Sequence, residues 1–242
     1  MKRMFILLFT LLCCCCNTEE PQNKITTDSI CIVGASFAYP ENCWFELACE
    51  QLQLKPINKA ISGSNIKDTA QSMRENSLFT LEELDSFATF AIMHTHNYNV
   101  FDGVGVHTPY VEAYDYVIKQ YIAICQALEY NPNSKWFGTM GGKPVDILIC
   151  THWHDARTNF NESVRKLDDK WEQVRLCKFD EQIGFTKDKP DPQTGVQISV
   201  YYAHPDQNAT EIMGGVEYGW HPKRGRDSEI QQRMADIFCK CF

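Results

Sequence analysis

The sequence predicts an α/β fold, a three-layer α/β/α sandwich with a central parallel sheet. From residue 29 onward, short apolar runs alternate with longer amphipathic stretches. Two of the apolar runs, SFATFAIMH (86–94) and PVDILICTH (144–152), are continuous, which is typical of strands buried on both faces. Strands that alternate with helices in this way favour a parallel sheet with helices on both of its faces.

The first third of the predicted domain contains two strands and two helices. SICIVG (29–34) is expected to be the first strand, and KPINKAI (55–61) a short strand that ends in the loop SGSN. Residues 42–54 predict a helix, because four apolar residues fall roughly on one face: Trp44, Leu47, Ala48 and Leu52. A second helix is expected over 66–79, with its N-terminus capped by Ser64 or Asn65.

The remaining elements continue the alternation after the buried strand 86–94. A long helix is predicted over 110–130, where NPNSK stops it, and the buried strand 144–152 follows. The last part is expected to contain a helix over 161–174, a short strand over 175–179, an extra strand or extended arm over 196–203, and a closing helix over 226–240. No linker interrupts this pattern, so residues 29–242 are expected to form one domain.

The N-terminus is expected to be an export signal rather than part of the domain. MKRMFILLFTLLCCCC has two basic residues, an apolar run too short to span a bilayer, and four cysteines. This stretch resembles a bacterial lipoprotein signal, in which a leucine-x-x-cysteine box is cleaved and the cysteine is lipidated. Cys14, Cys15 and Cys16 all remain candidates for that cysteine. We expect a signal over 1–16, a polar tether over 17–28, and attachment to the bacterial cell envelope by lipid.

The composition of the chain argues against two classes of binding partner. Hydrophobic residues make up 44% of the chain and charged residues 22%, as in ordinary globular proteins, and the net charge is −8. No run of lysine or arginine forms a patch, which disfavours nucleic acid and anionic membrane surfaces as partners. We therefore expect no nucleic acid, no membrane contact beyond the lipid anchor, and a monomer.

Eight cysteines follow the leader, and in an exported protein an even number permits disulfides. Cys31, Cys125 and Cys150 lie within apolar runs, where a free cysteine behaves as a small hydrophobe. Cys239 and Cys241 are close enough to the end of the closing helix to pair with Cys43 or Cys49, which leaves disulfides as an open alternative. The absence of a C-x-x-C pair in the domain disfavours a structural zinc site.

Candidate catalytic residues lie in the loops that follow the predicted strands, where parallel α/β folds place their chemistry. Ser36 follows the first strand, and a serine becomes a nucleophile when a base takes its proton. His221, in VEYGWHPKRG ahead of the closing helix, is the candidate base. Attack on a carbonyl also needs donors for the oxyanion, and Gly63 offers a backbone N–H while Asn97 offers a side-chain amide.

In this order, the loops resemble the four blocks of the SGNH (GDSL-type) hydrolase family. IVGASFAYPENCW resembles the first block, NKAISGSNIKDTA the second, FAIMHTHNYN the third and YGWHPKRGRDSEIQQRMADIF the last. The resemblance implies an SGNH-hydrolase or flavodoxin-like fold that uses no cofactor. It further implies Ser36 as the nucleophile, His221 as the general base, and an oxyanion hole formed by Ser36, Gly63 and Asn97.

The chain departs from the family pattern in ways that mark a divergent member. The first block usually reads glycine-aspartate-serine, and here Ala35 precedes Ser36. The family usually has an aspartate three residues before the histidine, and here that residue is Tyr218. Glu217, one position out of register, is a candidate for the orienting acid; alternatively, a main-chain carbonyl orients the imidazole in a serine–histidine dyad.

The function implied by the resemblance is hydrolysis of an ester, with a short acyl group such as acetyl on a carbohydrate as the expected substrate. Three residues are candidates for the substrate cleft: Trp153, His154 and Trp220. Two alternatives remain open. The pairs His94/His96 and His152/His154 lie at strand ends and predict a metal-dependent hydrolase if each pair shares one ion. Aromatic residues near the cleft fit, instead, an inactive lipoprotein that binds glycan.

Overall fold

The computed structural model describes residues 25–94, 104–152, 158–183 and 221–242. Its centre is a five-stranded parallel sheet with the strand order β2-β1-β3-β4-β5. The strands are β1 (Ser29–Gly34), β2 (Lys55–Asn58), β3 (Phe87–Met93), β4 (Asp146–Cys150) and β5 (Val174–Cys177). The predicted parallel α/β fold is therefore confirmed. The segment 196–203, expected to be a strand or an extended arm, lies outside the described residues.

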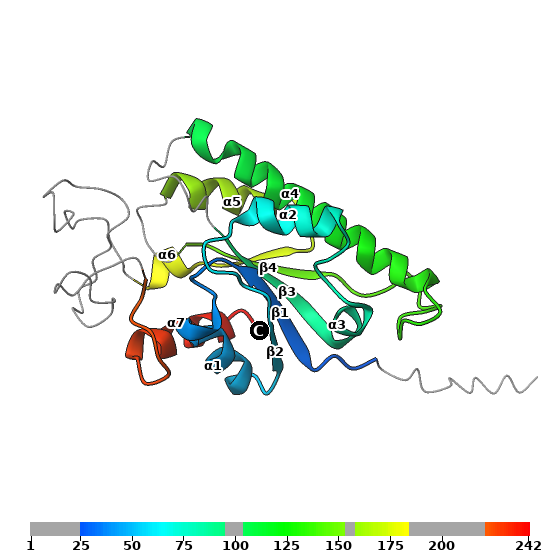
Figure 1. Ribbon diagram of the computed structural model, residues 1–242, viewed down its shortest axis with the longest axis horizontal. Coiled ribbons are helices and arrows are strands. Elements are labelled where there is room, and N and C mark those ends of the chain that lie inside the picture. The colour runs from blue at the N-terminus through cyan, green and yellow to red at the C-terminus, as the bar shows by residue number, and fades with distance from the viewer. Residues whose placement is uncertain (1–24, 95–103, 153–157, 184–220) are drawn as a thin grey trace, which may run out of the picture.

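Helices cover both faces of the sheet (Figure 1). On one face lie α1 (Trp44–Gln51) and α7 (Glu229–Cys239), which pack against each other. The other face carries α2 (Ile66–Arg74), α4 (Val104–Ala127) and α5 (Thr158–Lys170). The remaining helical segments are short: η1 (Pro40–Asn42), α3 (Leu81–Ser86), η2 (Leu128–Tyr130) and α6 (Phe179–Gln182). Among the described residues, no helix is long and apolar enough to cross a membrane.

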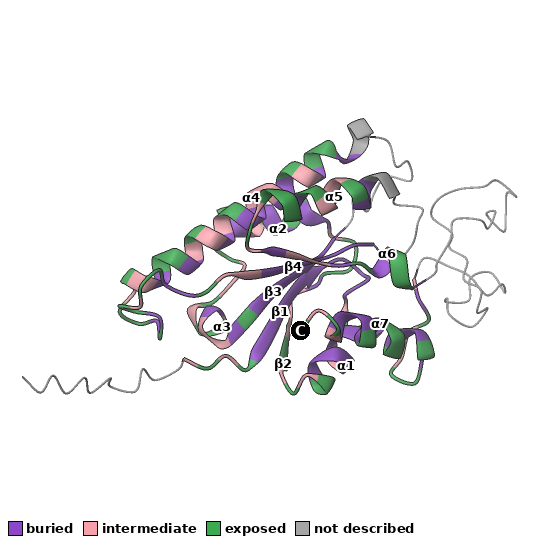
Figure 2. Ribbon diagram, turned by 180° about the vertical axis from the view of Figure 1, so that it is seen from behind, coloured by how far each residue is buried: buried purple, intermediate pink, exposed green. Residues whose placement is uncertain are grey.

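The alternation of side chains along β1 divides the core into two layers. Ile30 and Ile32 pack into the layer beneath α1 and α7, whereas Cys31 and Val33 pack into the layer beneath α2, α4 and α5. All six residues of β1 are buried, and Figure 2 shows the buried residues concentrated on the central strands and on the helix surfaces that face them. This burial on both faces explains why the central strands lack the polar alternation of a half-exposed strand.

Several predicted helix boundaries were wrong, for local reasons. The helix expected over 66–79 ends at Arg74, because Asn76 adopts a left-handed conformation with φ of 52°. A separate helix, α3, then begins after Thr80, whose side chain forms a capping box with Glu83. At the start of α2, Asn65 rather than Ser64 is the cap, and it forms a capping box with Asp68.

Three other boundaries also differ from the predictions. Helix α4 begins at Val104 and runs through Pro109, which was expected to precede the helix. Helix α5 covers Thr158–Lys170 rather than 161–174, since Val174 is already part of β5, where it pairs with Ile147. Phe179, expected at the end of the last strand, instead begins α6 and is buried in the layer beneath α1 and α7.

All eight cysteines of the domain are free thiols in the structure. Cys31, Cys125 and Cys150 are buried among apolar side chains, as predicted. Burial raises the pKa of the Cys49 thiol to about 12, so this thiol stays protonated at neutral pH. The disulfides considered for Cys239 and Cys241 with Cys43 or Cys49 are not formed.

Gly34 is required by a close approach of two chain segments at the end of β1. A Cβ at this position would lie 2.7 Å from the Ala38 Cβ and 2.8 Å from the carbonyl oxygen of Met93. We predict that Gly34→Ala lowers the free energy of unfolding by about 1 to 3 kcal/mol, because backbone must shift to admit the methyl group. Urea denaturation measures the change. An unfolding free energy equal to that of the wild type would contradict this packing argument.

Candidate active site

The candidate site lies at the carboxyl ends of β1 and β3. After β1 the chain first adds β2 on one side of it and then β3 on the other, so the strand order reverses between β1 and β3. Open parallel sheets bind their ligands outside the carboxyl ends of the strands at such a reversal. The Ala35 N–H donates to the carbonyl of Met93 over 3.3 Å, which ties the loop after β1 to the end of β3.

The structure brings Ser36 and His221 together across 185 positions of sequence. Ser36 Oγ and His221 Nε2 lie 2.9 Å apart, which is hydrogen-bond distance for a nucleophile and its base. Ser36 is 9% exposed and His221 is half-buried, so both residues are largely shielded from solvent. The ring of Phe37 lies beside both His221 and His152, at centroid distances of 5.7 and 4.8 Å.

The loop that carries Ser36 is held by hydrogen bonds to its backbone carbonyls. The side chain of Asn42 donates to the carbonyl of Ser36, and the Trp44 indole donates to the carbonyl of Phe37 over 2.8 Å. Asn58, at the end of β2, donates to the carbonyl of Ala38 over 2.8 Å. Because each donor belongs to a different element, the position of Ser36 is fixed from three sides.

Gln231, on α7, connects the Ser36 loop with the His221 loop. Its side chain is completely buried, accepts from the Trp44 backbone N–H over 3.2 Å and donates to the Lys223 carbonyl over 3.0 Å. Its amide nitrogen also lies 3.5 Å from the Asn42 side-chain oxygen. Sequence reasoning missed Asn42, Asn58 and Gln231. Their one signal was the placement of amides within otherwise apolar helical patterns or at a strand end.

The second loop, SGSN, is attached to the end of β1. The Ile61 N–H and the Ser64 hydroxyl both donate to the carbonyl of Gly34, over 2.9 and 3.1 Å. Gly63, in this loop, has φ of 80°, a left-handed conformation that favours glycine. Among the described residues, no acceptor takes the Ser36 backbone N–H. The roles of Ser36 and Gly63 in an oxyanion hole stay a prediction.

Of the described residues, Arg224 lies beside the far nitrogen of the imidazole. Arg224 Nη2 is 3.4 Å from His221 Nδ1, and Arg224 Nη1 bonds to the carboxylate of Glu41, which lies in η1 shortly after Ser36. Glu217 and Tyr218, which bear on the orienting acid, lie outside the described residues. Glu217 therefore stays a prediction.

Two buried side chains fix the ends of β3 and β4, where the chain enters the loops that follow these strands. The Tyr114 hydroxyl accepts from the backbone N–H of His94 and donates to the carbonyl of the same residue, over 3.0 and 2.8 Å. Asn161 does the same at His152, over 2.8 and 3.3 Å. Asn97, Trp153, His154 and Trp220, as well as His96, lie outside the described residues, so their predicted roles are untested.

The described members of the two histidine pairs make contacts within the protein. His94 is 2% exposed and its Nε2 is hydrogen-bonded to the Thr69 hydroxyl over 2.9 Å, whereas His152 packs edge-on against Phe37. Among the described residues, no three histidine, cysteine or acidic side chains are grouped so that they could hold a metal ion. His96 and His154 fall outside that set, and the metal alternative remains an untested prediction.

The buried His94 predicts a loss of stability in acid. Burial lowers the pKa of His94 to about 3, whereas the unfolded chain takes up a proton near the ordinary value of 6.5. The unfolded state therefore binds more protons between these values, and stability falls as the pH drops below 6.5, by about 3 kcal/mol at pH 4.

This loss is measured by urea denaturation at pH 7, 5.5 and 4 in wild type and in His94→Gln, which has no imidazole to protonate. We expect the free energy of unfolding of the wild type to fall relative to that of His94→Gln as the pH falls. The carboxylates contribute equally to the pH dependence of unfolding in both proteins, so their contribution cancels in the difference. Parallel curves for the two proteins, or an imidazole that titrates near pH 6.5 by NMR, would contradict the assignment.

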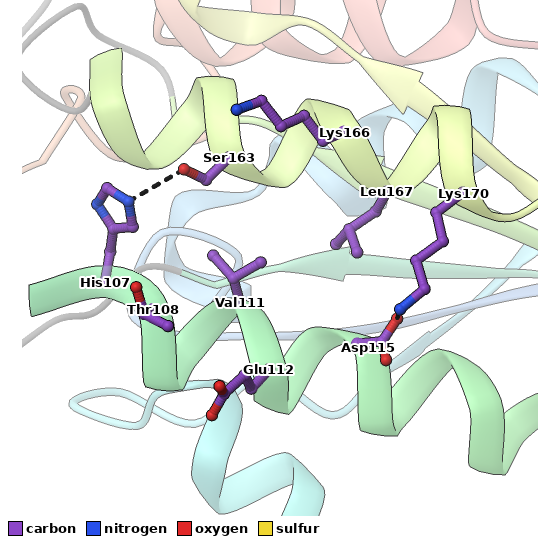
Figure 3. Close-up of a pocket in the computed structure, with 9 residues that line it drawn as sticks. All are labelled: His107, Thr108, Val111, Glu112, Asp115, Ser163, Lys166, Leu167 and Lys170. Carbon is purple, nitrogen blue, oxygen red and sulfur yellow. Dashed lines mark hydrogen bonds and ion pairs between the residues drawn. The ribbon is translucent and has the colours of Figure 1, made fainter. Parts of the chain in front are cut away.

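A separate cavity of about 420 Å³ lies between α4 and α5 (Figure 3). At one end His107 Nε2 is hydrogen-bonded to Ser163 Oγ over 3.0 Å, and at the other Lys170 pairs with Asp115 over 2.6 Å. Although this end also contains a serine and a histidine, both project from helices that cover the sheet rather than from loops at the strand ends. The cavity is distinct from the Ser36–His221 site.

Solved structures establish the class of fold that this sheet and these loops define. A putative SGNH hydrolase from Slackia heliotrinireducens matches with a TM-score of 0.51 at 11% identity, over 89% of this chain and 98% of its own. A putative lipolytic protein of the G-D-S-L family from Desulfitobacterium hafniense DCB-2 matches with a TM-score of 0.50 at 12% identity, over 89% of this chain and 100% of its own. The chain has the SGNH-hydrolase fold, as the sequence resemblance predicted.

The family itself is given by a match over residues 27–242. The chain belongs to the family described as "Domain of unknown function (DUF5040)". No curated protein sequence matches the chain.

Proposed function

We propose that this protein is a serine-dependent ester hydrolase that removes acetyl or other short acyl groups from a carbohydrate. The observation that carries the hydrolase proposal is the 2.9 Å contact between Ser36 Oγ and His221 Nε2 at the strand-order reversal of an SGNH fold. A serine and a histidine from distant loops meet there, next to a backbone N–H that no described residue uses. The carbohydrate part of the proposal is supported by the predicted envelope location and by the family resemblance.

In the proposed reaction, His221 Nε2 takes the proton of Ser36 Oγ as this oxygen bonds to the ester carbonyl carbon. The negative charge that develops on the carbonyl oxygen is stabilised by the backbone N–H groups of Ser36 and Gly63 and by the Asn97 amide. When the carbon–oxygen bond of the ester breaks, His221 gives its proton to the leaving alcohol. Water, deprotonated by His221, then attacks the acyl carbon; as the bond to Ser36 Oγ breaks, His221 returns the proton to that oxygen and the acyl group leaves as a carboxylic acid.

We further propose that the protein is exported and held at the bacterial cell envelope by an N-terminal lipid. The basic start, short apolar run and cysteines of residues 1–16 support this, and the polar residues 17–28 would let the domain reach a glycan substrate. Labelling with radioactive palmitate in a bacterial host tests the anchor. Loss of the label when Cys14, Cys15 and Cys16 are all replaced by serine is the expected result.

Hydrolysis of p-nitrophenyl acetate by the purified protein tests the enzymatic proposal. We expect turnover that EDTA does not change and that phenylmethylsulfonyl fluoride abolishes, with the sulfonyl group located on Ser36 by mass spectrometry. Activity that EDTA removes and that persists without Ser36 labelling would instead favour the metal-dependent alternative. A protein that binds glycan but hydrolyses no ester would favour the binding-protein alternative.

A further inference from the structure

A small basic cluster follows the candidate base in an otherwise acidic protein. Lys223, Arg224 and Arg226 lie within five residues of His221, although the chain has 31 acidic and only 23 basic residues. Lys223 and Arg226 are exposed, and Arg226 pairs with Glu50 on α1 over 2.6 Å. Arg224 differs from them because its guanidinium is directed at the site, with Nη2 3.4 Å from His221 Nδ1.

The position of Arg224 relative to the reacting atoms indicates which part of a substrate it meets. Ser36 Oγ contacts Nε2 of the His221 imidazole, and Arg224 Nη2 contacts Nδ1 of the same ring. A general base of this kind hands its proton to the leaving alcohol, so the alcohol part of the ester must lie against the histidine and its loop. A substituent on that alcohol is therefore closer to Arg224 than the acyl group is.

The guanidinium is partly exposed, and its ion pair with Glu41 can be exchanged. The Arg224 side chain is 34% exposed, and its Glu41 partner is 61% exposed. Exposed ion pairs contribute little to stability, because water screens the charges and two long side chains lose freedom. An anion on a bound substrate can thus replace Glu41 at small cost, and arginine binds carboxylate and phosphate through two parallel N–H donors.

We propose that the Ser36–His221 site prefers esters whose alcohol part carries a carboxylate or phosphate, and that Arg224 binds this anion. The inference rests on the proposed hydrolase function, since it uses the direction in which His221 delivers its proton. Glu41 holds the guanidinium in position while the site is empty and competes with the substrate anion. Lys223, which forms no ion pair with any described residue, adds to the positive potential at this edge.

Matched acetyl esters test the preference. The substrates are 4-acetoxybenzoate, its neutral methyl ester, and 4-acetoxyphenyl phosphate, so that carboxylate and phosphate are compared with an uncharged leaving group. We expect wild type to show a kcat/KM about tenfold higher for the anionic esters than for the methyl ester at low salt, and less at high salt. Whichever of the two anions gives the higher ratio identifies the source of the charge in the natural substrate.

Two variants should change that ratio in opposite directions, and a third should leave it unchanged. Arg224→Gln should lower the ratio about tenfold, and Glu41→Gln should raise it two- to fivefold, because the competing carboxylate is removed. Arg226→Gln is the matched control from the same loop and should leave the ratio unchanged. If Arg224 and Glu41 only brace the two loops, both variants would instead slow every ester alike. That result, or a wild type without charge preference, overturns the proposal.

Binding separates a failure of this inference from a failure of the proposed function. Ser36→Ala cannot form the acyl-enzyme, so its affinity for intact 4-acetoxybenzoate is measured by calorimetry, with and without Arg224→Gln. Loss of at least fivefold in affinity in the double variant supports anion binding by Arg224 even if the wild type hydrolyses no ester. Equal affinity in the two proteins overturns the inference, whatever the wild type hydrolyses.

Discussion

Replacing Ser36 with alanine is expected to lower kcat for p-nitrophenyl acetate by about 10⁴-fold or more, to the rate supported by the remaining site. The Ser36 hydroxyl is hydrogen-bonded to His221 Nε2 and is the group expected to form the acyl-enzyme. Because Ser36 is small and lies at the end of the sheet, the variant should keep the wild-type unfolding curve. Stopped assays with extended incubation measure the residual rate.

The double variant Ser36→Ala/His221→Ala distinguishes a catalytic pair from two independent contributions. When two residues act together in one step, replacing either one removes the contribution of both to kcat. The double variant should therefore be about as slow as Ser36→Ala alone. Ser72→Ala, which removes an exposed hydroxyl on α2 bonded to the Asp68 carbonyl, is the control for serine replacement elsewhere. Full activity in Ser36→Ala would remove Ser36 from the mechanism.

Gln231→Leu is expected to have the largest effect of any residue outside the catalytic pair. The substitution keeps the approximate volume but leaves the buried Trp44 N–H without its side-chain acceptor and the partly buried Lys223 carbonyl without its donor. Each buried group left unsatisfied costs about 1 to 3 kcal/mol, so we expect the free energy of unfolding to fall by about 2 to 4 kcal/mol. Loosening of the His221 loop should also lower kcat about ten- to a hundredfold, with little change in KM.

Gln232→Leu is the matched control, since the neighbouring glutamine is exposed and donates to the Arg226 carbonyl over 2.9 Å. Its stability and kcat should stay close to wild type. The two variants are compared by urea denaturation and by p-nitrophenyl acetate kinetics at a temperature where both are folded. If Gln231→Leu loses stability and keeps full kcat, Gln231 supports the fold without positioning the catalytic loops.

The sequence alone predicted the sheet and the order of its strands along the chain, because a strand that is buried on both faces consists of a continuous run of apolar residues. Strand β1 was predicted with the bounds it has, and β3 and β4 to within one or two residues at each end. Helix ends were predicted less well, since they depend on single conformations, such as the left-handed Asn76, and on caps that compete over a few residues. Local patterns favour several adjacent ends almost equally, and packing selects one.

The positions of the loops after β1 and β2 could also be predicted, because parallel strands bring their carboxyl ends to one edge of a sheet. That rule and the family resemblance were sufficient to select Ser36 and His221 as partners. The hydrogen bond between them could not be predicted from spacing, because it depends on how α7 packs on α1 and where Gln231 reaches the two loops.

The fold class was thus determined by periodicity, and Ser36 and His221 were selected as candidates by residue identity in two loops and by the family resemblance, which are properties of short segments. The tertiary structure alone decided what surrounds that pair. It places the Arg224 guanidinium beside His221 Nδ1 and links it to Glu41, a residue 183 positions earlier in the chain. Contacts of this kind arise from packing between segments that are distant in the sequence, and the pattern of residues within one segment does not predict which other segment it contacts.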